Sequence, residues 1–190
     1  MTFINDKFKH FKNTIDYDII EGSICDDLEL YIYKIFNNFD IHNILEIGFN
    51  GGISSGLMLS INDNIKITSI DIGYHNYIKN AKIHIDNLFP NRHELLIGDS
   101  RDIVPSLNQN YDFIFIDGGH REPVPQMDII NCKSISNQNT LLCIDDWCDV
   151  FGSDGVNQAI ENSINSSIIV CLDRQISGRH GWGLFKYVYG

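Results

Sequence analysis

The sequence predicts an α/β protein built on one doubly wound, mostly parallel sheet with helices on both faces. Short apolar runs rich in β-branched residues alternate with amphipathic stretches along the chain, as they do in consecutive βα units. The first six runs are almost continuously apolar, which is typical of strands covered on both faces. No repeat, low-complexity tract or linker divides the 190 residues, so a single domain over 1–190 is predicted.

Seven apolar runs are predicted to form the strands of this sheet. They occupy residues 43–47, 66–70, 94–97, 112–116, 140–144, 168–172 and 183–188. The last run follows the sixth after a loop that contains Gly178 and Gly181 and has no helical pattern. Because a parallel connection needs a longer crossover, the seventh strand is predicted to pair antiparallel.

Six amphipathic stretches are predicted to form helices. The first begins with Asp26 and Asp27, where the helix dipole favours acidic side chains, and its Tyr31, Tyr33 and Phe36 are interpreted as a face that packs on the core. The helices are expected over residues 26–39, 53–61, 76–88, 101–108, 124–134 and 154–164. Residues 1–25 are then an N-terminal extension, and residues 26–188 form the core of the domain.

Composition excludes several functional classes. The chain has 25 acidic and 14 basic side chains and a formal net charge of −11, which argues against binding to nucleic acid or anionic membranes. The apolar runs are far shorter than the ~20 residues that span a bilayer, and the first residues show no apolar signal core. Five cysteines without a Cys-x-x-Cys pair indicate reduced thiols in an intracellular, cytoplasmic protein.

Acidic residues follow five successive predicted strands. In a doubly wound sheet, ligands bind beyond the carboxyl ends of the strands, near the point where strand order reverses. These side chains are therefore expected to meet at one edge of the sheet and to contribute to a site. They are Glu46, Asp71, Asp99, Asp117, Asp145 and Asp146.

The turn after the first strand has the pattern acid-x-Gly-x-x-x-Gly, from Glu46 to Gly52. Its glycine spacing differs from that of the Gly-x-Gly-x-x-Gly loop, which binds a dinucleotide pyrophosphate. In addition, an acid at this position would repel phosphate and attract an ammonium group. Asp71 is placed to accept ribose hydroxyls, and Asp99 is placed to meet an adenine edge. A ligand with a ribose, an adenine and an amino-acid end but no phosphate is S-adenosylmethionine.

Over about residues 25–188 the chain resembles the class I S-adenosylmethionine-dependent methyltransferases, which have a Rossmann-like fold. The segments 46–55, 116–120 (Ile-Asp-Gly-Gly-His) and 144–146 (Ile-Asp-Asp) are similar to the small-molecule O-methyltransferase branch, which includes the catechol and macrolide-sugar enzymes. The resemblance implies methyl transfer to a hydroxylated small molecule, such as a sugar or polyol.

The resemblance also implies roles for single residues. Ser54 would meet the methionine carboxylate, Asp71 the ribose, and Asp99 with Ser100 the adenine. The implied cofactor-binding set is Glu46, Gly48, Asn50, Gly52, Ser54, Asp71, Asp99, Ser100 and Asp117. Structural alternatives stay open: the glycines could only permit a tight turn, Ser54 and the pair Asp99-Ser100 could be helix caps, and Asp71 could be a turn residue.

Three carboxylates at one sheet edge repel each other unless a cation lies between them. The resemblance implies that Asp117, Asp145 and Asp146 bind Mg²⁺ or another divalent cation. It also implies that His120 is the general base, a role that suits an imidazole near neutral pH. As alternatives, His120 could be a loop residue hydrogen-bonded to a carboxylate, and Asp145-Asp146 could cap a turn before Trp147.

The remaining candidates are weaker. The short segment 147–155 leaves no room for a lid domain, so the acceptor pocket is expected to be shallow, or completed by the N-terminal segment or by a second subunit of a homo-oligomer. His75, His84 and His93 are expected on the surface. A tail group either borders the acceptor pocket or consists of a packed tryptophan and a solvated loop. This group is Arg174, Arg179, His180 and Trp182.

Other functions would use part of the same residue pattern. A non-catalytic protein that binds a nucleoside or a sugar would share the glycine loop and Asp71, but it would need neither His120 nor clustered acids. A methyltransferase acting on protein or nucleic acid is a further alternative, although the acidic charge disfavours the nucleic-acid version. A dinucleotide oxidoreductase is disfavoured by the glycine spacing.

Overall fold

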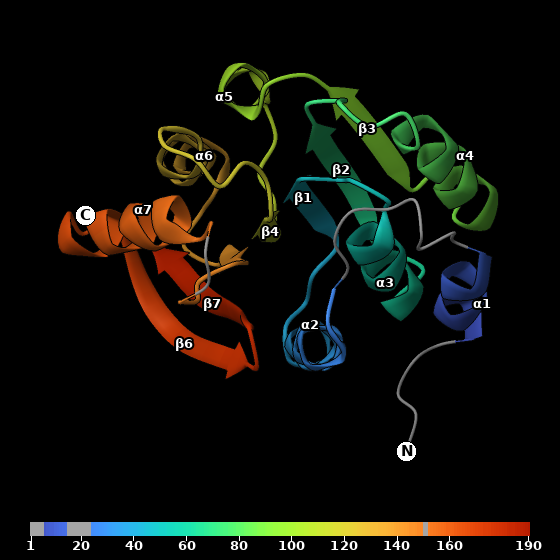
Figure 1. Ribbon diagram of the computed structural model, residues 1–190, viewed down its shortest axis with the longest axis horizontal. Coiled ribbons are helices and arrows are strands. Elements are labelled where there is room, and N and C mark those ends of the chain that lie inside the picture. Colours follow the sequence, from blue (N-terminus) through green and yellow to red (C-terminus); the bar gives the residue numbers. More distant parts are fainter. Residues whose placement is uncertain (1–5, 15–23, 150–151) are drawn as a thin grey trace.

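The computed structural model describes residues 6–14, 24–149 and 152–190, and its centre is one seven-stranded sheet (Figure 1). The strand order is β3-β2-β1-β4-β5-β7-β6, and β7 runs antiparallel to both of its neighbours, β5 and β6. The strands are β1 (Asn43–Ile47), β2 (Lys66–Asp71), β3 (His93–Ile97), β4 (Phe113–Ile116), β5 (Leu141–Ile144), β6 (Ile169–Ser177) and β7 (His180–Tyr187). The predicted doubly wound fold with an antiparallel last strand is confirmed.

Helices cover both faces of the sheet (Figure 1). They are α1 (Asp6–Thr14), α2 (Asp26–Asn38), α3 (Ile53–Ile61), α4 (Ile78–Leu88), α5 (Ser100–Ile103), α6 (Val124–Cys132) and α7 (Asp154–Asn165), with 3₁₀ turns at Val104–Ser106 and Lys133–Ile135. One hydrophobic cluster lies between the sheet and α1 to α4, and a second lies between the sheet and α6 and α7. Two buried layers explain why the central strands are apolar on both faces.

Helix α1 falls in the segment expected only as an extension. Its Phe8 and Phe11 are fully buried, and they pack on α3, where Gly56 permits the contact. A Cβ atom at Gly56 would lie 2.6 Å from Cε1 of Phe11. With α1 and α2 on its outer side, α3 is buried almost throughout.

Two edge strands differ from the expectation that the first six strands are covered on both faces. Ile97 in β3 and Leu172 in β6 are exposed, because each edge strand has a neighbour on one side only. Strand β6 is also longer than predicted and forms a hairpin with β7, in which Gly178 occupies the turn at φ +61°. The predicted loop is therefore mostly strand.

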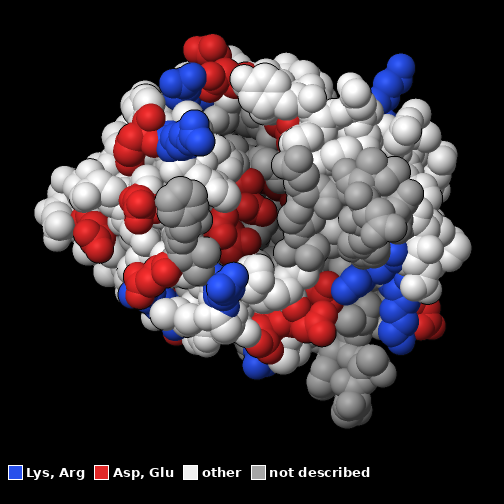
Figure 2. All heavy atoms as spheres, viewed as in Figure 1, with Lys and Arg blue, Asp and Glu red and all other residues white. Residues whose placement is uncertain are grey.

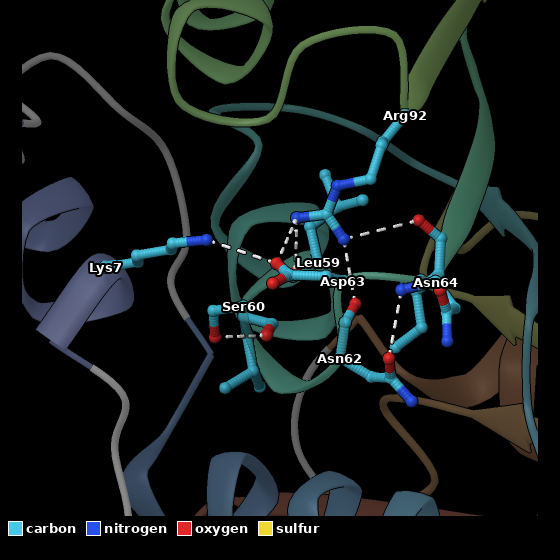
Figure 3. Close-up of polar contacts among 9 residues, drawn as sticks. Lys7, Leu59, Ser60, Asn62, Asp63, Asn64 and Arg92 are labelled. Carbon is cyan, nitrogen blue, oxygen red and sulfur yellow. Dashed lines mark hydrogen bonds and ion pairs between the residues drawn. The ribbon is translucent and has the colours of Figure 1, made fainter.

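The C-terminal end of α3 is held by the side chain of Arg92 (Figure 3). The Arg92 guanidinium donates to the carbonyl oxygens of Leu59 at 2.9 Å and Asn62 at 2.8 Å, which satisfies carbonyls that a helix end leaves unpaired. The Asp63 carboxylate forms ion pairs with Lys7 at 3.1 Å and with Arg92 at 3.6 Å. Because α3 begins at the candidate site, Arg92 anchors the far end of a helix that supports it.

We expect Arg92→Ala to lower the free energy of unfolding by about 1–3 kcal/mol, since it leaves helix carbonyls without their charged donor. Urea denaturation measures the change. Asp63→Ala is the matched comparison, because it removes the ion pairs and keeps the carbonyl contacts; its carboxylate is 83% exposed, so its effect should be smaller. Equal destabilisation by the two variants would contradict the proposed capping role.

Candidate active site

A pocket of about 730 Å³ opens at the carboxyl ends of β1, β2, β4 and β5, where the strand order reverses between β1 and β4. Figure 2 shows a hollow on this face with acidic side chains inside it. The volume is in the range of small-molecule and cofactor sites. Nine members of the predicted cofactor and metal sets are among the residues that line it: Gly48, Asn50, Ser54, Asp71, Asp99, Ser100, Asp117, Asp145 and Asp146.

The glycine-rich turn brings the end of β1 close to the end of β4. Gly48 has φ +98°, and a Cβ atom there would lie 1.9 Å from the carbonyl oxygen of Asp117. Gly52 has φ +73°, so both positions use conformations that favour glycine. Asn50 has φ +48° and accepts a 2.6 Å hydrogen bond from the Tyr77 hydroxyl. The tight-turn role is confirmed, and the same turn forms one wall of the pocket.

Asp71 fixes this turn from the end of β2. Its Oδ2 accepts the backbone N–H groups of Phe49 at 3.0 Å and Asn50 at 2.9 Å, and its Oδ1 accepts Gly73 N–H at 2.8 Å. The turn-residue alternative is therefore confirmed. A carboxylate has about four acceptor positions, so Asp71, which lines the pocket, keeps capacity for a ribose hydroxyl.

Glu46 does not face the pocket, so the expected contact with a ligand ammonium group is wrong. Its side chain is fully buried. Oε1 accepts the Ser54 hydroxyl at 2.5 Å, and Oε2 accepts the hydroxyls of Ser55 and Ser69. The carboxylate lies behind the turn because side chains alternate along β1, and Glu46 points to the face covered by α3, where Ser54 and Ser55 contact it.

Ser54 lines the pocket, so its predicted contact with the cofactor stays a prediction, but the alternative that it caps the helix is wrong. The helix N-cap is Gly52, and the Ser54 hydroxyl proton is donated to Glu46. A ligand carboxylate needs hydrogen-bond donors. The backbone N–H groups in the first turn of α3 can serve, because the first N–H groups of a helix have no partner within the helix.

His93 completes this buried network, although a surface position was expected for it. Its Nε2 lies 2.9 Å from Ser69 Oγ, and burial lowers the pKa of His93 to about 3. The sequence carried a signal that was missed. Glu46 and Ser69 are register partners on neighbouring parallel strands, so two polar side chains lie next to each other on a face that is otherwise apolar.

The buried carboxyl group gives a pH prediction. Burial raises the pKa of Glu46 to about 7, so the folded protein holds a proton that the unfolded chain releases near its ordinary pKa. This contribution to stability is present below the unfolded pKa and is lost as pH rises through about 7. Glu46→Gln removes the proton exchange, so its Tm should fall less between pH 5.5 and 8 than that of the natural protein.

Thermal unfolding at several pH values measures this difference. Glu94→Gln is the matched control, because Glu94 is an exposed acid on β3 and should keep the natural pH dependence. A Glu46→Gln variant with the same slope as the natural protein would rule out Glu46 as its source.

Asp99 and Ser100 stand at the end of β3 and line the pocket. Asp99 Oδ1 accepts the N–H of Arg101 at 2.9 Å and so caps α5, which confirms the capping alternative. The Arg101 side chain also pairs with Asp99, and these contacts hold the Asp99 pKa at about 2. Ser100 Oγ donates to Oδ1 of buried Asp128 at 2.6 Å. Asp128 was not among the predicted site residues.

Asp117, His120 and Asp146 bring their donor atoms together in the pocket. One oxygen or nitrogen from each lies within 4.8 Å of the others, and His120 Nε2 is 2.8 Å from Asp146 Oδ2. The predicted contact of His120 with a carboxylate is confirmed. Asp145 lies outside this group, and its Oδ1 accepts the N–H of Asp146 at 2.9 Å. The structure thus groups His120, rather than Asp145, with the other two predicted ligands.

The backbone at Asp146 is left-handed, with φ +61°. Such a conformation is uncommon outside glycine, although Asp and Asn tolerate it. In this conformation the Asp146 carboxylate contacts His120 at 2.8 Å. Strained backbone of this kind clusters at functional sites.

The acids in this cluster raise each other's proton affinity. Burial, followed by the charges of Asp145 and Asp146, raises the pKa of Asp117 well above its ordinary value. Burial and then Asp146 raise the pKa of Asp145 to about 7. The hydrogen bond with Asp146 raises the pKa of His120. Partly buried carboxylates that repel each other are stabilised by a cation, and oxygen donors beside an imidazole fit a divalent metal.

The four residues of the tail group have different surroundings in the structure. His180 lines the pocket, whereas Trp182 is buried and packs on Tyr31 at 5.8 Å between ring centroids. The guanidinium of Arg174 lies 4.2 Å from the Trp147 ring. Packing is therefore confirmed for Trp182. The other three side chains are exposed, as expected, but only Arg179 lies in a turn, whereas Arg174 and His180 belong to β6 and β7.

Two further residues reach the pocket. His75 lines the pocket and stacks on Tyr77, with 4.9 Å between the ring centroids. It is half-buried, so it is partly exposed, as expected, and also forms part of the pocket wall. Ile24, the residue that precedes Cys25 in the predicted extension, also lines it. Residues 15–23 and 150–151, on which the expectations about the N-terminal segment and the 147–155 segment partly depend, lie outside the described residues.

Comparison with known proteins identifies the family. A model described as a methyltransferase domain matches residues 45–147, more than half of the chain. A search of curated protein sequences finds no match. Among the described residues, no helix is both long enough and apolar enough to cross a membrane.

Solved structures share the fold. An O-methyltransferase from Bacillus cereus in complex with S-adenosylhomocysteine has a TM-score of 0.77 at 15% identity, covering 97% of this chain and 91% of that one. The O-methyltransferase TomG from Streptomyces achromogenes, involved in tomaymycin synthesis and solved with S-adenosylmethionine, has a TM-score of 0.74 at 16% identity, covering 100% of both chains. The S-adenosylhomocysteine-bound methyltransferase PaMTH1 from Podospora anserina has a TM-score of 0.73 at 13% identity, covering 97% and 87%.

The matched segment runs from Leu45 in β1 to Trp147, so it includes all the lining residues of the pocket except Ile24 and His180. The chain therefore belongs to the methyltransferase-domain family, with the fold of the class I S-adenosylmethionine-dependent enzymes.

Proposed function

We propose that the protein is an S-adenosylmethionine-dependent O-methyltransferase that acts on a hydroxylated small molecule with the help of a divalent metal. The observation that carries the proposal is the convergence of Asp117, His120 and Asp146 within 4.8 Å in the same pocket as the glycine-rich turn. The turn that would bind the cofactor and the cluster that could activate a hydroxyl group thus line the same pocket.

The cofactor side of the pocket suits an adenosyl amino acid. The turn at Gly48 brings the backbone close to the pocket, and Asp71 at the end of β2 offers acceptors for ribose hydroxyls. Asp99 and Ser100 follow β3, the strand next to β2 in the sheet. When bound, S-adenosylmethionine would supply an electrophilic methyl group on a sulfonium ion. The acidic lining also suits the positive charge of that ion.

On the metal side of the pocket, each of the clustered residues has a proposed role. Asp117 and Asp146 would hold Mg²⁺ or a similar hard cation, and it would supply Lewis-acid polarisation of an acceptor hydroxyl. His120 would accept the proton of that hydroxyl, and Asp146 would orient its ring through the 2.8 Å contact. Asp145, at the same sheet edge, adds negative charge that favours cation binding.

The alternative of a non-catalytic protein that binds a nucleoside or a sugar explains less of the pocket. It accounts for the glycine turn and Asp71 but not for the proximity of His120 to two carboxylates. A methyltransferase for nucleic acid is disfavoured by the net charge of −11. We also propose an intracellular setting, supported by five cysteines that are all unpaired.

Methyl transfer tests this proposal. The protein is incubated with methyl-labelled S-adenosylmethionine, Mg²⁺ and a panel of sugars, polyols and catechols, and the labelled products are identified by mass spectrometry. We expect the label on oxygen and a loss of turnover when a chelator is added. Transfer to nitrogen or carbon, or turnover that is unchanged by chelation, would contradict the proposed chemistry.

A further inference from the structure

Gly155, in the first turn of α7, lies against the loop that carries His120. A Cβ atom at Gly155 would be 2.2 Å from the His120 carbonyl oxygen and 3.2 Å from the backbone nitrogen of Glu122. The first distance is shorter than any ordinary contact, and both neighbours are backbone atoms, which cannot move aside as the end of a flexible side chain can. Only a residue without a Cβ atom therefore lets α7 approach this loop so closely.

No other feature of Gly155 that the structure describes requires glycine. Its φ is not among the positive values found at six other glycines, so the backbone conformation would accept any L-residue. Within a helix, glycine is less favourable than alanine, because it loses more conformational freedom on folding. The close approach to the His120 loop accounts for a glycine at a position where alanine would favour the helix.

The same end of α7 also holds the turn that follows Asp146. Asn157 Nδ2 donates to the Cys148 carbonyl oxygen at 2.8 Å, and Ser153 Oγ lies 3.4 Å from Cys148 Sγ. The Cys148 N–H in turn donates to the Asp146 carbonyl oxygen at 2.9 Å. One end of one helix thus contacts both the segment of His120 and the segment of Asp146.

The contact between His120 and Asp146 depends on where these two segments lie. His120 follows β4 and Asp146 follows β5, and their side chains meet at 2.8 Å. A shift of either segment by a fraction of this distance would separate them, and a misplacement of about 1 Å can cost a reaction about 100-fold in rate. The positive φ of Asp146 also persists only where neighbouring contacts hold it.

On this basis, and resting on the proposed function for its effect on turnover, we propose that Gly155 is a positioning residue that seats the His120 loop on α7 and so holds the imidazole against Asp146. Asn157 holds the Asp146 side from the same helix. Neither residue is among those that line the described pocket, so both act through their neighbours. A methyl group at Gly155 would push the His120 loop and α7 apart.

Kinetics of the whole protein test this role. Gly155→Ala should lower kcat by about 10- to 100-fold and leave the KM for S-adenosylmethionine within about twofold. In the His120→Ala background the same change should lower the residual turnover by less than about twofold, because a residue that acts through His120 has no further effect once His120 is absent. Gln158→Ala, an exposed position on α7, is the control and should keep natural turnover.

NMR of the imidazole groups gives a second readout, which needs neither cofactor nor metal. The signal of His120 is the one that is missing from the spectrum of His120→Ala. It should shift in Gly155→Ala and in Asn157→Ala, because its contact with Asp146 changes, and it should stay in place in Gln158→Ala. If thermal unfolding shows that Gly155→Ala is misfolded, Asn157→Ala decides the question.

Three results would overturn the inference. They are natural kcat in folded Gly155→Ala, an equal loss of turnover from Gly155→Ala with and without His120, or a His120 signal that does not move in the folded variants. Absence of turnover in the natural protein would overturn the proposed function. The NMR comparison would then still decide whether Gly155 and Asn157 position His120.

Discussion

Replacing His120 with alanine should lower turnover by about 100- to 10,000-fold, the usual contribution of a positioned general base. Binding of S-adenosylhomocysteine should stay within about twofold, because His120 stands on the metal side of the pocket and not at the glycine turn. Steady-state kinetics and calorimetry measure the two effects separately. His42→Ala is the control, since His42 precedes β1 at the opposite end of the sheet.

The pH profile identifies the role of His120. The contact with Asp146 raises its pKa above the ordinary value of 6.5, and only the neutral imidazole accepts a proton. Turnover should therefore rise as pH passes upward through that pKa, and the residual activity of His120→Ala should lack this rise. If the variant instead loses metal affinity in parallel with turnover, His120 is a metal ligand and the base assignment is wrong.

Removing the Asp146 carboxylate should weaken divalent-metal binding by about 100-fold or more and reduce turnover in proportion. Asp146→Gly is the suitable variant, because glycine accepts the φ of +61° at this position without strain. Asp146→Asn keeps an amide oxygen and the same backbone preference, so its effect should be intermediate. Calorimetric titration with Mg²⁺ and Mn²⁺ measures the affinities.

Asp149→Asn is the matched control for this series, because Asp149 is an exposed acid nearby in the sequence. It should change neither metal affinity nor turnover. Natural metal affinity in Asp146→Gly, or full turnover after the metal is removed with a chelator, would show that the acid cluster has another purpose.

The framework of the sheet was predictable because its signal is local. Continuous apolar runs mark strands that are covered on both faces, so β1 and the buried helix α3 were predicted with the bounds that the structure gives them. The convergence of Asp71 and Asp117 at one edge followed from topology alone, since parallel strands end at the same edge of a sheet. Helix α1 was not predictable in this way, because its two buried aromatic residues acquire meaning only through their packing on Gly56.

The direction of individual side chains was harder to predict. An acid in an apolar strand predicts a special role for Glu46, but strand alternation turns its carboxylate toward Ser55 and Ser69 and away from the pocket. In the left-handed conformation of Asp146, its carboxylate contacts His120. Asp128 lies 28 residues after Ser100 in the sequence, and no local pattern links the two.

The central claim is that the pocket between β1 and β4 binds an adenosyl amino-acid cofactor. Titration of the natural protein with S-adenosylhomocysteine, with and without Mg²⁺, tests it most directly. We predict one site per chain with a dissociation constant in the micromolar range, clear weakening in Asp71→Ala, and a separate Mg²⁺-binding event that Asp146→Gly abolishes. No detectable binding of S-adenosylhomocysteine, or equal binding by Asp71→Ala, would contradict the account.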